Sequence, residues 1–243
     1  MSHKFVAFDL ETAKEVPGDD FDWESHRPLG ISCAALLMSV DSTPEFVHGK
    51  NTEGRPAKQL SRDEAGELVV RLTGLVEQQF TILTWNGLGF DFDVLAEESG
   101  MVDACRKIAT NHVDMMFHVF CDRGFPVALD KVAQGMGIPG KSAGMSGFMA
   151  PRMWAEGRFD EVLAYVGQDV RMTLQIAQVC ASQKRMSWIT RKGTASSMDL
   201  KRGWLSVEES LKLPSPDTSW MTQPMSRDRF TRWITCRPAG KRE

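Results

Sequence analysis

The chain has 243 residues, of which 42% are hydrophobic and 25% are charged, as in ordinary soluble globular proteins. No apolar run approaches the ~20 residues that span a bilayer, and the N-terminus shows no signal-peptide pattern. The five cysteines are scattered, without a Cys-x-x-Cys pair, which argues against a disulfide framework or a zinc site. We therefore expect one sizeable α/β domain in a reducing cytoplasm, with buried cysteines and no membrane partner.

The net charge of −3 conceals a strong asymmetry along the chain. Residues 1–181 contain 16 Lys and Arg against 26 Asp and Glu, a net −10, whereas residues 182–243 contain 13 against 6, a net +7. An acidic excess suits a carboxylate-rich metal site, and a basic end suits a polyanionic partner. Either half is equally explained by solvated surface charge.

The first 85 residues are predicted to form four strands and one helix. The expected strands are residues 5–12, 29–40, 45–50 and 80–85. Short turns join the second strand to the third, and residues 13–28 form a loop, so the first three strands suggest an antiparallel meander. Ser61-Arg-Asp-Glu64 has the form of a capping box, and it begins an amphipathic helix that runs to about Gln79.

From Asp91 onward the pattern is mostly helical. The expected helices are residues 91–99, 101–109, 114–121, 129–136, 148–156 and 159–184, separated by glycines. The last sixty residues contain four prolines, among them Pro214, Pro216 and Pro224, and four of the seven tryptophans. They are typical of short elements packed on the main domain rather than of a second independent core.

The first acidic constellation ends the first strand, in Phe-Val-Ala-Phe-Asp9-Leu-Glu11-Thr. Residues two apart on a strand project to the same face, so both carboxylates would point into one small space. Like charges held that close are costly unless a cation lies between them, and a hard divalent cation prefers oxygen ligands. An ordinary solvated strand end is the alternative.

The second constellation is Trp85-Asn86-Gly-Leu-Gly-Phe90-Asp91-Phe-Asp93, between a strand and a helix. Helix capping and an Asn-Gly turn would explain these residues without any function. Asp91 and Asp93 are not expected to serve together, because residues two apart in a helix point in roughly opposite directions. Helix capping likewise explains Asp114.

The third constellation is Tyr165-Val-Gly-Gln-Asp169, within the last long helix. Residues four apart share a helix face, so the phenol and the carboxylate would project together. Tyr165 is the only tyrosine of the chain. Its alternative role is that of a buried aromatic side chain with a satisfied hydroxyl group.

Together these three constellations resemble the exonuclease motifs of the DEDD superfamily, the DnaQ-like 3′–5′ exonucleases with a ribonuclease H-like fold. The resemblance covers residues 4 to about 183, and the tyrosine four residues before Asp169 is typical of the DEDDy branch. The sequence around Asn86 and Asp169 is similar to that of predicted exonucleases related to the proofreading domain of family B DNA polymerases. The resemblance implies an α/β fold in which helices flank a mixed central sheet, built from the antiparallel meander plus a parallel strand.

The resemblance also implies a mechanism. Asp9, Glu11, Asp91 and Asp169 would hold two Mg²⁺ or Mn²⁺ ions ~3.5–4 Å apart. Asp9 would bridge both ions, Glu11 and Asp169 would hold the ion that activates water, and Asp91 would help to hold the other. Tyr165 would orient the attacking water, and the products would be nucleoside 5′-monophosphates.

The substrate side of the site is expected to involve four residues, namely Leu10, Thr12, Asn86 and Phe90. For Leu10 and Phe90 a place in the core is about equally expected. DNA, in its single-stranded form, is the expected substrate. The alternatives are an exoribonuclease acting on RNA or short oligonucleotides and a non-catalytic nucleic-acid-binding subunit. The exoribonuclease stays open because the same type of site hydrolyses the phosphodiesters of both DNA and RNA.

We accordingly divide the chain into an exonuclease domain at residues 1–185 and a basic, tryptophan-rich C-terminal appendage at residues 186–243. Basic residues interleaved with aromatics suit a single strand, whose phosphates pair with the charges while its bases stack on the rings. The candidate charges are Lys184, Arg185, Arg191, Lys192, Lys201 and Arg202, and the candidate rings are Trp188, Trp204, Trp220 and Trp233. Alternatively, the tryptophans cover an edge of the core.

Overall fold

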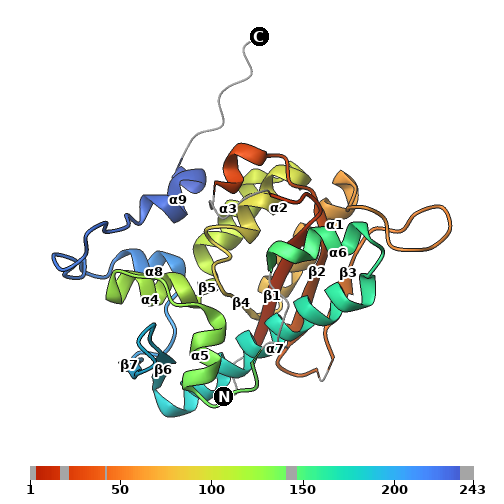
Figure 1. Ribbon diagram of the computed structural model, residues 1–243. Coiled ribbons are helices and arrows are strands. Elements are labelled where there is room, and N and C mark those ends of the chain that lie inside the picture. The colour runs from red at the N-terminus through yellow and green to blue at the C-terminus, as the bar shows by residue number, and fades with distance from the viewer. Residues whose placement is uncertain (1–3, 17–21, 42, 141–146, 236–243) are drawn as a thin grey trace, which may run out of the picture.

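A mixed five-stranded sheet forms the centre of the protein in the computed structural model, which describes residues 4–16, 22–41, 43–140 and 147–235 (Figure 1). The strands are β1 (Phe5–Thr12), β2 (Ile31–Met38), β3 (Glu45–Val47), β4 (Thr81–Thr84) and β5 (Val113–Asp114). Their order is β3-β2-β1-β4-β5. The first three strands are antiparallel neighbours, whereas β4 is parallel to β1 and β5 is parallel to β4. The predicted meander and mixed α/β sheet are therefore confirmed.

The helices also follow the sequence pattern closely. They are α1 (Arg62–Glu77), α2 (Asp91–Ser99), α3 (Val102–Asn111), α4 (Met115–Arg123), α5 (Leu129–Gly135), α6 (Ala150–Ala155) and α7 (Phe159–Gln183), with short 3₁₀ turns η1 (Trp23–His26) and η2 (Gly147–Met149). The capping box before α1 is confirmed by two hydrogen bonds. Ser61 Oγ accepts from the Glu64 backbone N–H at 3.2 Å, and the Glu64 carboxylate accepts from the Ser61 backbone N–H at 2.7 Å.

Two features of the fold differ from the sequence prediction. Residues after 90 contain a fifth sheet strand, β5, and a separate hairpin of β6 (Arg185–Ile189) and β7 (Ala195–Asp199). β5 has only two residues, which is too short for an alternating pattern to be recognised in the sequence. The sheet therefore contains two parallel strands rather than the one expected.

Alternation along β1 divides its apolar side chains between two cores. Val6 and Phe8 lie in the cluster that contains α1 and α2, whereas Phe5 and Ala7 lie in the cluster that contains the valines of α7. Figure 1 shows α6 and α7 on one side of the sheet and α1 to α3 on the other. The face of β1 that carries Phe5 and Ala7 is therefore the face that looks toward α7.

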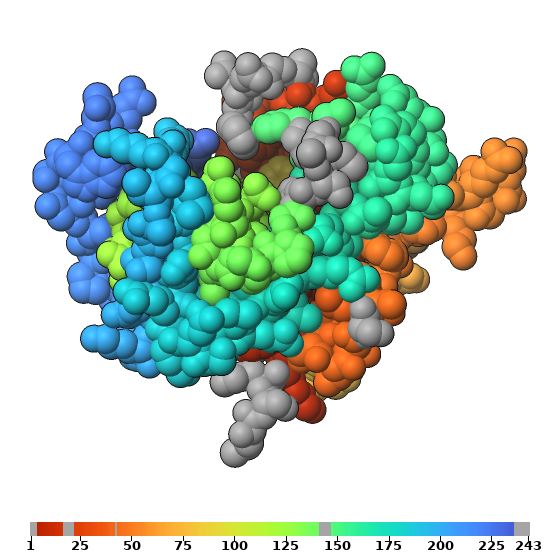
Figure 2. Space-filling model, turned by 60° about the horizontal axis from the view of Figure 1, so that its bottom comes forward, coloured from red at the N-terminus to blue at the C-terminus, as the bar shows by residue number. Residues whose placement is uncertain are grey.

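The first elements after residue 184 lie against two helices of the preceding chain. The β6–β7 hairpin packs on α5, and α8 (Val207–Leu211) packs on α4. Figure 2 shows this part of the chain, in cyan to blue, beside the green residues of α4 and α5. A last helix, α9 (Asp228–Thr235), follows an extended connection. The division at residues 185 and 186 falls at the start of β6 and stays an interpretation.

The four C-terminal tryptophans have different surroundings. Trp188 is 4% exposed within the core, Trp204 packs edge-on against His118 at 5.6 Å, and the Trp233 indole donates to the Leu88 carbonyl at 2.7 Å. Trp220 is 67% exposed. Packing on the core therefore accounts for three of these rings, and stacking on a nucleic acid is open mainly to Trp220.

Other expectations from composition agree with the structure. Cys33, Cys105, Cys121 and Cys180 are buried free thiols, whereas Cys236 lies outside the described residues. Burial raises the pKa of the Cys105 thiol to about 12. Among the described residues, no helix combines the length and the apolar character needed to cross a membrane.

The contact between α5 and β6 leads to a stability prediction. A Cβ on Gly135 would lie 2.4 Å from the Trp188 Cα and 2.6 Å from its backbone nitrogen, and backbone atoms cannot move aside cheaply. Gly135→Ala should therefore lower the free energy of unfolding by about 1–3 kcal/mol, as overpacking does. Denaturant titration would measure the change.

Gly74→Ala is the matched control, because a Cβ on Gly74, also in a helix, would meet nothing within 4 Å. This variant should be as stable as the natural protein, or more stable by up to ~1 kcal/mol. Equal stability of the two alanine variants would show that α5 and β6 are not packed as closely as described.

Candidate active site

Two acidic side chains leave β1 on the face that looks toward α7. Asp9 and Glu11 continue the row begun by Phe5 and Ala7. Asp169 of α7 faces them, and one ligand oxygen from each of the three carboxylates lies within 4.8 Å of the other two. Three like charges at this spacing repel one another unless a cation joins them, and an all-oxygen donor set suits Mg²⁺ or Mn²⁺. We refer to Asp9, Glu11 and Asp169 as the acidic cluster.

The apolar stripe of α7 places Asp169 and Tyr165 toward the sheet. Val162, Val166 and Val170 are buried against the core, and the helical period carries Tyr165 and Asp169 inward beside them. Tyr165 is 7% exposed. Its hydroxyl lies near the backbone of Gly147, since a Cβ on that glycine would be 3.8 Å from the Tyr165 oxygen. The phenol and the carboxylate thus share a helix face, as the spacing of four residues predicted.

Asp91 reaches the same edge of the sheet from a different element. Because β1 and β4 are parallel, the segments that follow them meet at one edge. The Leu10 backbone N–H donates to Asp91 Oδ1 at 3.0 Å, which joins the start of α2 to β1. Burial is the main cause that raises the pKa of the Asp91 carboxyl to about 7; the Leu10 N–H bond opposes this rise, and the carboxylates of Asp114 and Asp169 add to it. Asp91 therefore lies beside the acidic cluster without being one of its three members.

Asp93 has a separate partner. Its carboxylate forms an ion pair with Arg27, which also binds Glu97 at 2.9 Å and lies over the Trp23 ring at 4.6 Å. Asp91 and Asp93 consequently face different surroundings, as expected for residues two apart in a helix.

Asp114 holds the loop that precedes α2. Its carboxylate accepts from the backbone N–H of Phe117 at 3.0 Å, which confirms the predicted helix cap. It also accepts from the N–H groups of Asn86 at 3.0 Å and Leu88 at 2.9 Å, two contacts that local sequence did not indicate. Burial raises the pKa of this carboxyl to about 6. Asn86 itself adopts φ of 76°, a conformation that asparagine tolerates better than most residues.

A family model described as the RNase_H superfamily matches residues 36–181 of the chain. The chain belongs to the RNase H superfamily. The match includes Asp91, Tyr165 and Asp169, and begins after Asp9 and Glu11. The ribonuclease H-like fold predicted from the sequence is thereby confirmed, with its mixed sheet flanked by helices.

Solved structures similar to this RNase H superfamily member carry the description exonuclease I. They are exonuclease I in complex with inhibitor BCBP (14% identity, TM-score 0.42, 76% of this chain and 42% of that chain), an ExoI/SSB-Ct complex (14%, 0.36, 81% and 52%) and a moderately thermophilic exonuclease I from Methylocaldum szegediense (13%, 0.33, 75% and 41%). The chain spans about half or less of the length of each. No curated protein matches the sequence.

In this RNase H superfamily member a buried histidine completes the support of the loop before α2. His112 Nδ1 lies 2.7 Å from the Ala109 carbonyl, which can only accept, so Nδ1 carries the proton. His112 Nε2 then accepts from the Thr84 hydroxyl at 2.9 Å, and Thr84 Oγ1 accepts from the Gly87 N–H at 3.1 Å. Burial lowers the pKa of His112 to about 4, so the ring is neutral and structural at neutral pH.

The four residues expected to contact substrate differ in accessibility. Leu10 is 3% exposed and lies in the core, and Thr12 is 7% exposed with its hydroxyl donating to the Lys14 carbonyl at 3.5 Å. Phe90 is half-buried against the edge of Trp23 at 5.0 Å, and Asn86 lines a groove described below. A role in substrate binding stays a prediction for all four.

Proposed function

We propose that the protein is a metal-dependent 3′–5′ exonuclease that hydrolyses the terminal phosphodiester of single-stranded DNA and releases nucleoside 5′-monophosphates. The observation that supports this proposal is the acidic cluster, whose three carboxylates lie within 4.8 Å of one another at the carboxyl end of β1 in an RNase H-like fold. Carboxylates are costly to bring together, and a site that gathers three of them is suited to binding a hard cation.

The residues present fit two Mg²⁺ or Mn²⁺ ions. Asp9, Glu11 and Asp169 offer only carboxylate oxygens, the donors that both ions prefer, and Asp91 adds a fourth carboxylate nearby. When bound, such ions supply positive charge to a phosphodiester and make a nucleophile of water at neutral pH. The chain itself holds Asp91 in place through the Leu10 N–H and holds the loop before it through Asp114.

Tyr165 has a positioning role in this proposal. It lies one helical turn before Asp169 on the same face of α7. A phenol with a pKa of ~10 is a poor base at neutral pH. A hydrogen bond that orients the attacking water is the role that suits it.

Digestion of end-labelled oligonucleotides tests the direction of hydrolysis. Single-stranded DNA should be shortened from its 3′ end only when Mg²⁺ or Mn²⁺ is present, and excess chelator should stop the reaction. A blocked 3′ terminus should abolish digestion, whereas a blocked 5′ terminus should leave the rate unchanged. Labelled nucleoside 5′-monophosphate, separated by chromatography, measures the reaction.

Closed circular single strands are the matched control, because they offer no terminus. Cleavage of circles would contradict the exonuclease proposal, and full activity in chelator would contradict metal dependence. DNA and RNA of the same sequence should be compared in parallel. Faster digestion of the RNA would replace the DNA proposal with an exoribonuclease.

A further inference from the structure

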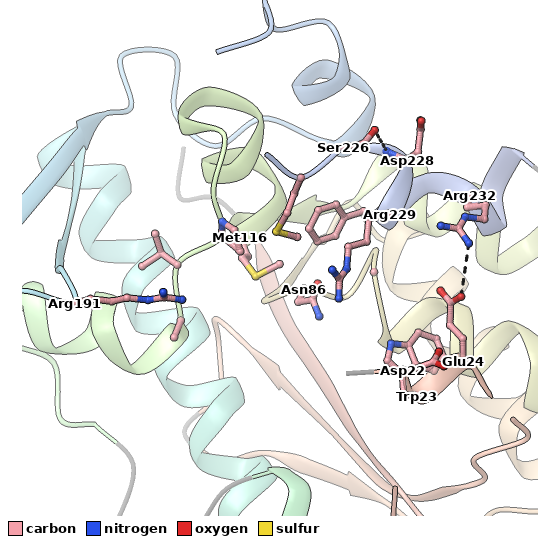
Figure 3. A pocket seen from close by; sticks show the side chains of 16 residues that line it. Asp22, Trp23, Glu24, Asn86, Met116, Arg191, Ser226, Asp228, Arg229 and Arg232 are labelled. Carbon is pink, nitrogen blue, oxygen red and sulfur yellow. Dashed lines mark hydrogen bonds and ion pairs between the residues drawn. The ribbon is translucent and has the colours of Figure 1, made fainter. Parts of the chain in front are cut away.

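A groove of about 1000 Å³ opens beside the loop that leads into Asp91 (Figure 3). Three parts of the chain that are distant in sequence form its walls: residues 22–24 around η1, the β6–β7 turn at Arg191, and α9 with the segment before it. Asn86 and Gly89, from the loop that leads into Asp91, also line it. The groove is thus continuous with the loop that positions an acid of the proposed site.

Direct contacts attach α9 to this loop. The Trp233 indole donates to the Leu88 carbonyl, and the Phe230 ring lies so close to Gly89 that an added Cβ there would be 2.8 Å from it. Phe230 also packs on Phe120 at 4.8 Å. The wall formed by α9 is therefore fixed relative to the loop before Asp91.

Two arginines of the groove have guanidinium groups without a partner among the described residues. Within the described part of the chain, the exposed guanidinium groups of Arg191 and Arg229 form neither an ion pair nor a hydrogen bond. Figure 3 shows Arg229 directed toward Asn86 and Arg191 at the other side of the groove. Arg232, by contrast, pairs with Glu24 at 3.9 Å. A guanidinium presents a fork of N–H donors that matches the oxygens of a phosphate.

Part of the remaining lining suits unpaired bases. The groove also carries the carboxylates Asp22, Glu24 and Asp228, of which Glu24 pairs with Arg232. It is also lined by large apolar side chains, namely those of Trp23, Met116 and Met225. Aromatic rings and thioether sulfurs make favourable contacts with π-systems, and base stacking of this kind is tolerant of sequence. A duplex keeps its bases stacked inside and cannot use such a surface, so the combination favours a single strand over a duplex.

We propose that this groove holds the single-stranded segment that precedes the terminal nucleotide, with Arg191 and Arg229 pairing its phosphates. The proposal rests on the proposed nuclease function and names the path of the strand. It also revises the expectation from sequence, because Lys201 and Arg202 do not line the groove although they belong to the same basic appendage.

Binding of a fluorescein-labelled oligothymidylate, measured by anisotropy in excess chelator, tests the path without hydrolysis. The double variant Arg191→Ala/Arg229→Ala should bind at least ~10-fold more weakly, and its log-log salt slope should fall by about 1.4, or ~0.7 for each lost phosphate contact. Lys201→Ala/Arg202→Ala removes the same charge from exposed positions outside the groove and should bind as the natural protein does. Thermal melting of both variants should be unchanged, because all four side chains are exposed.

Each other outcome has a definite meaning. An equal loss of binding in the two double variants would show that general positive charge, and not the groove, holds the strand. An unchanged affinity of Arg191→Ala/Arg229→Ala, or a natural protein that binds a duplex as tightly as a single strand, would overturn the proposal directly.

A second substrate separates this proposal from the proposed function. The p-nitrophenyl ester of thymidine 5′-monophosphate has no preceding strand, so the groove variant should hydrolyse it at the natural rate while losing kcat/KM on the oligonucleotide. Equal losses on both substrates would place the two arginines in the reaction itself and overturn the groove. If the natural protein binds the strand but hydrolyses neither substrate, the nuclease proposal fails while the strand path stands.

Discussion

Asp169→Ala is expected to remove metal-dependent hydrolysis while leaving the protein folded. Loss of one contributor to electrostatic stabilisation of a transition state typically costs at least ~10²–10³-fold in turnover, and Asp169 is one of three carboxylates within 4.8 Å of one another. Asp9→Ala and Asp91→Asn should be similarly inactive. Digestion of end-labelled single-stranded DNA under Mg²⁺ measures the loss.

The same variant should change how metal affects stability. In the absence of metal the cluster is destabilised by repulsion, so removing one carboxylate should leave Tm equal or raise it. Mn²⁺ should raise the Tm of the natural protein, because a ligand that binds only the folded state stabilises it, and this increase should shrink in Asp169→Ala. A lowered Tm without metal would assign Asp169 a structural role instead.

Asp93→Ala is the control for the assignment within the second motif. Asp93 is buried and binds Arg27, whereas Asp91 accepts from the Leu10 N–H. The Asp93 variant should retain hydrolysis but lose stability, because removing one partner of a largely buried ion pair is destabilising. If it is as inactive as Asp91→Asn, the assignment of Asp91 as the acid of the site is wrong.

Tyr165→Phe is expected to reduce turnover by ~10²-fold or more while metal binding is retained, as for a lost general acid–base or water-positioning group. The substitution keeps the buried ring on α7 and deletes only the hydroxyl, which lies near Gly147. The Mn²⁺-dependent rise in Tm should match that of the natural protein, so the loss should appear in kcat. Single-turnover digestion measures it.

A comparison of Tyr165→Phe with Tyr165→Leu separates catalysis from packing. The leucine variant loses the ring as well as the hydroxyl, so it should lose stability in addition to turnover, by a few kcal/mol for a large buried side chain. A phenylalanine variant with an unchanged rate would mean that Tyr165 serves the core alone.

Local periodicity was sufficient to predict most elements and which candidate site residues share a face of one element. A period of two on β1 places Asp9 and Glu11 on one face, and a spacing of four on α7 places Tyr165 with Asp169. The capping box before α1 was equally legible, since its two contacts join residues three apart. These inferences depend on backbone geometry that repeats within a few residues.

The long-range hydrogen bonds that hold the loop before α2 could not be predicted from local sequence. Asp114 caps α4 by a local bond, which the sequence indicates, but its bonds to the Asn86 and Leu88 N–H groups span 28 and 26 residues. Those contacts form because β4 and β5 are parallel neighbours, so the ends of both strands meet at one edge. A two-residue strand carries no pattern from which that pairing could be inferred.

The sequence by itself determined the order and spacing of the acidic motifs, the meander and the charge asymmetry. Only the tertiary structure decided which basic and aromatic residues of the appendage face a groove. Composition alone cannot separate Trp188, which is 4% exposed, from Trp220, which is 67% exposed, because a ring that packs in a core and a ring that faces solvent have the same chemistry. Local periodicity establishes which residues share a face of an element, whereas long-range packing determines which faces meet and which side chains stay accessible.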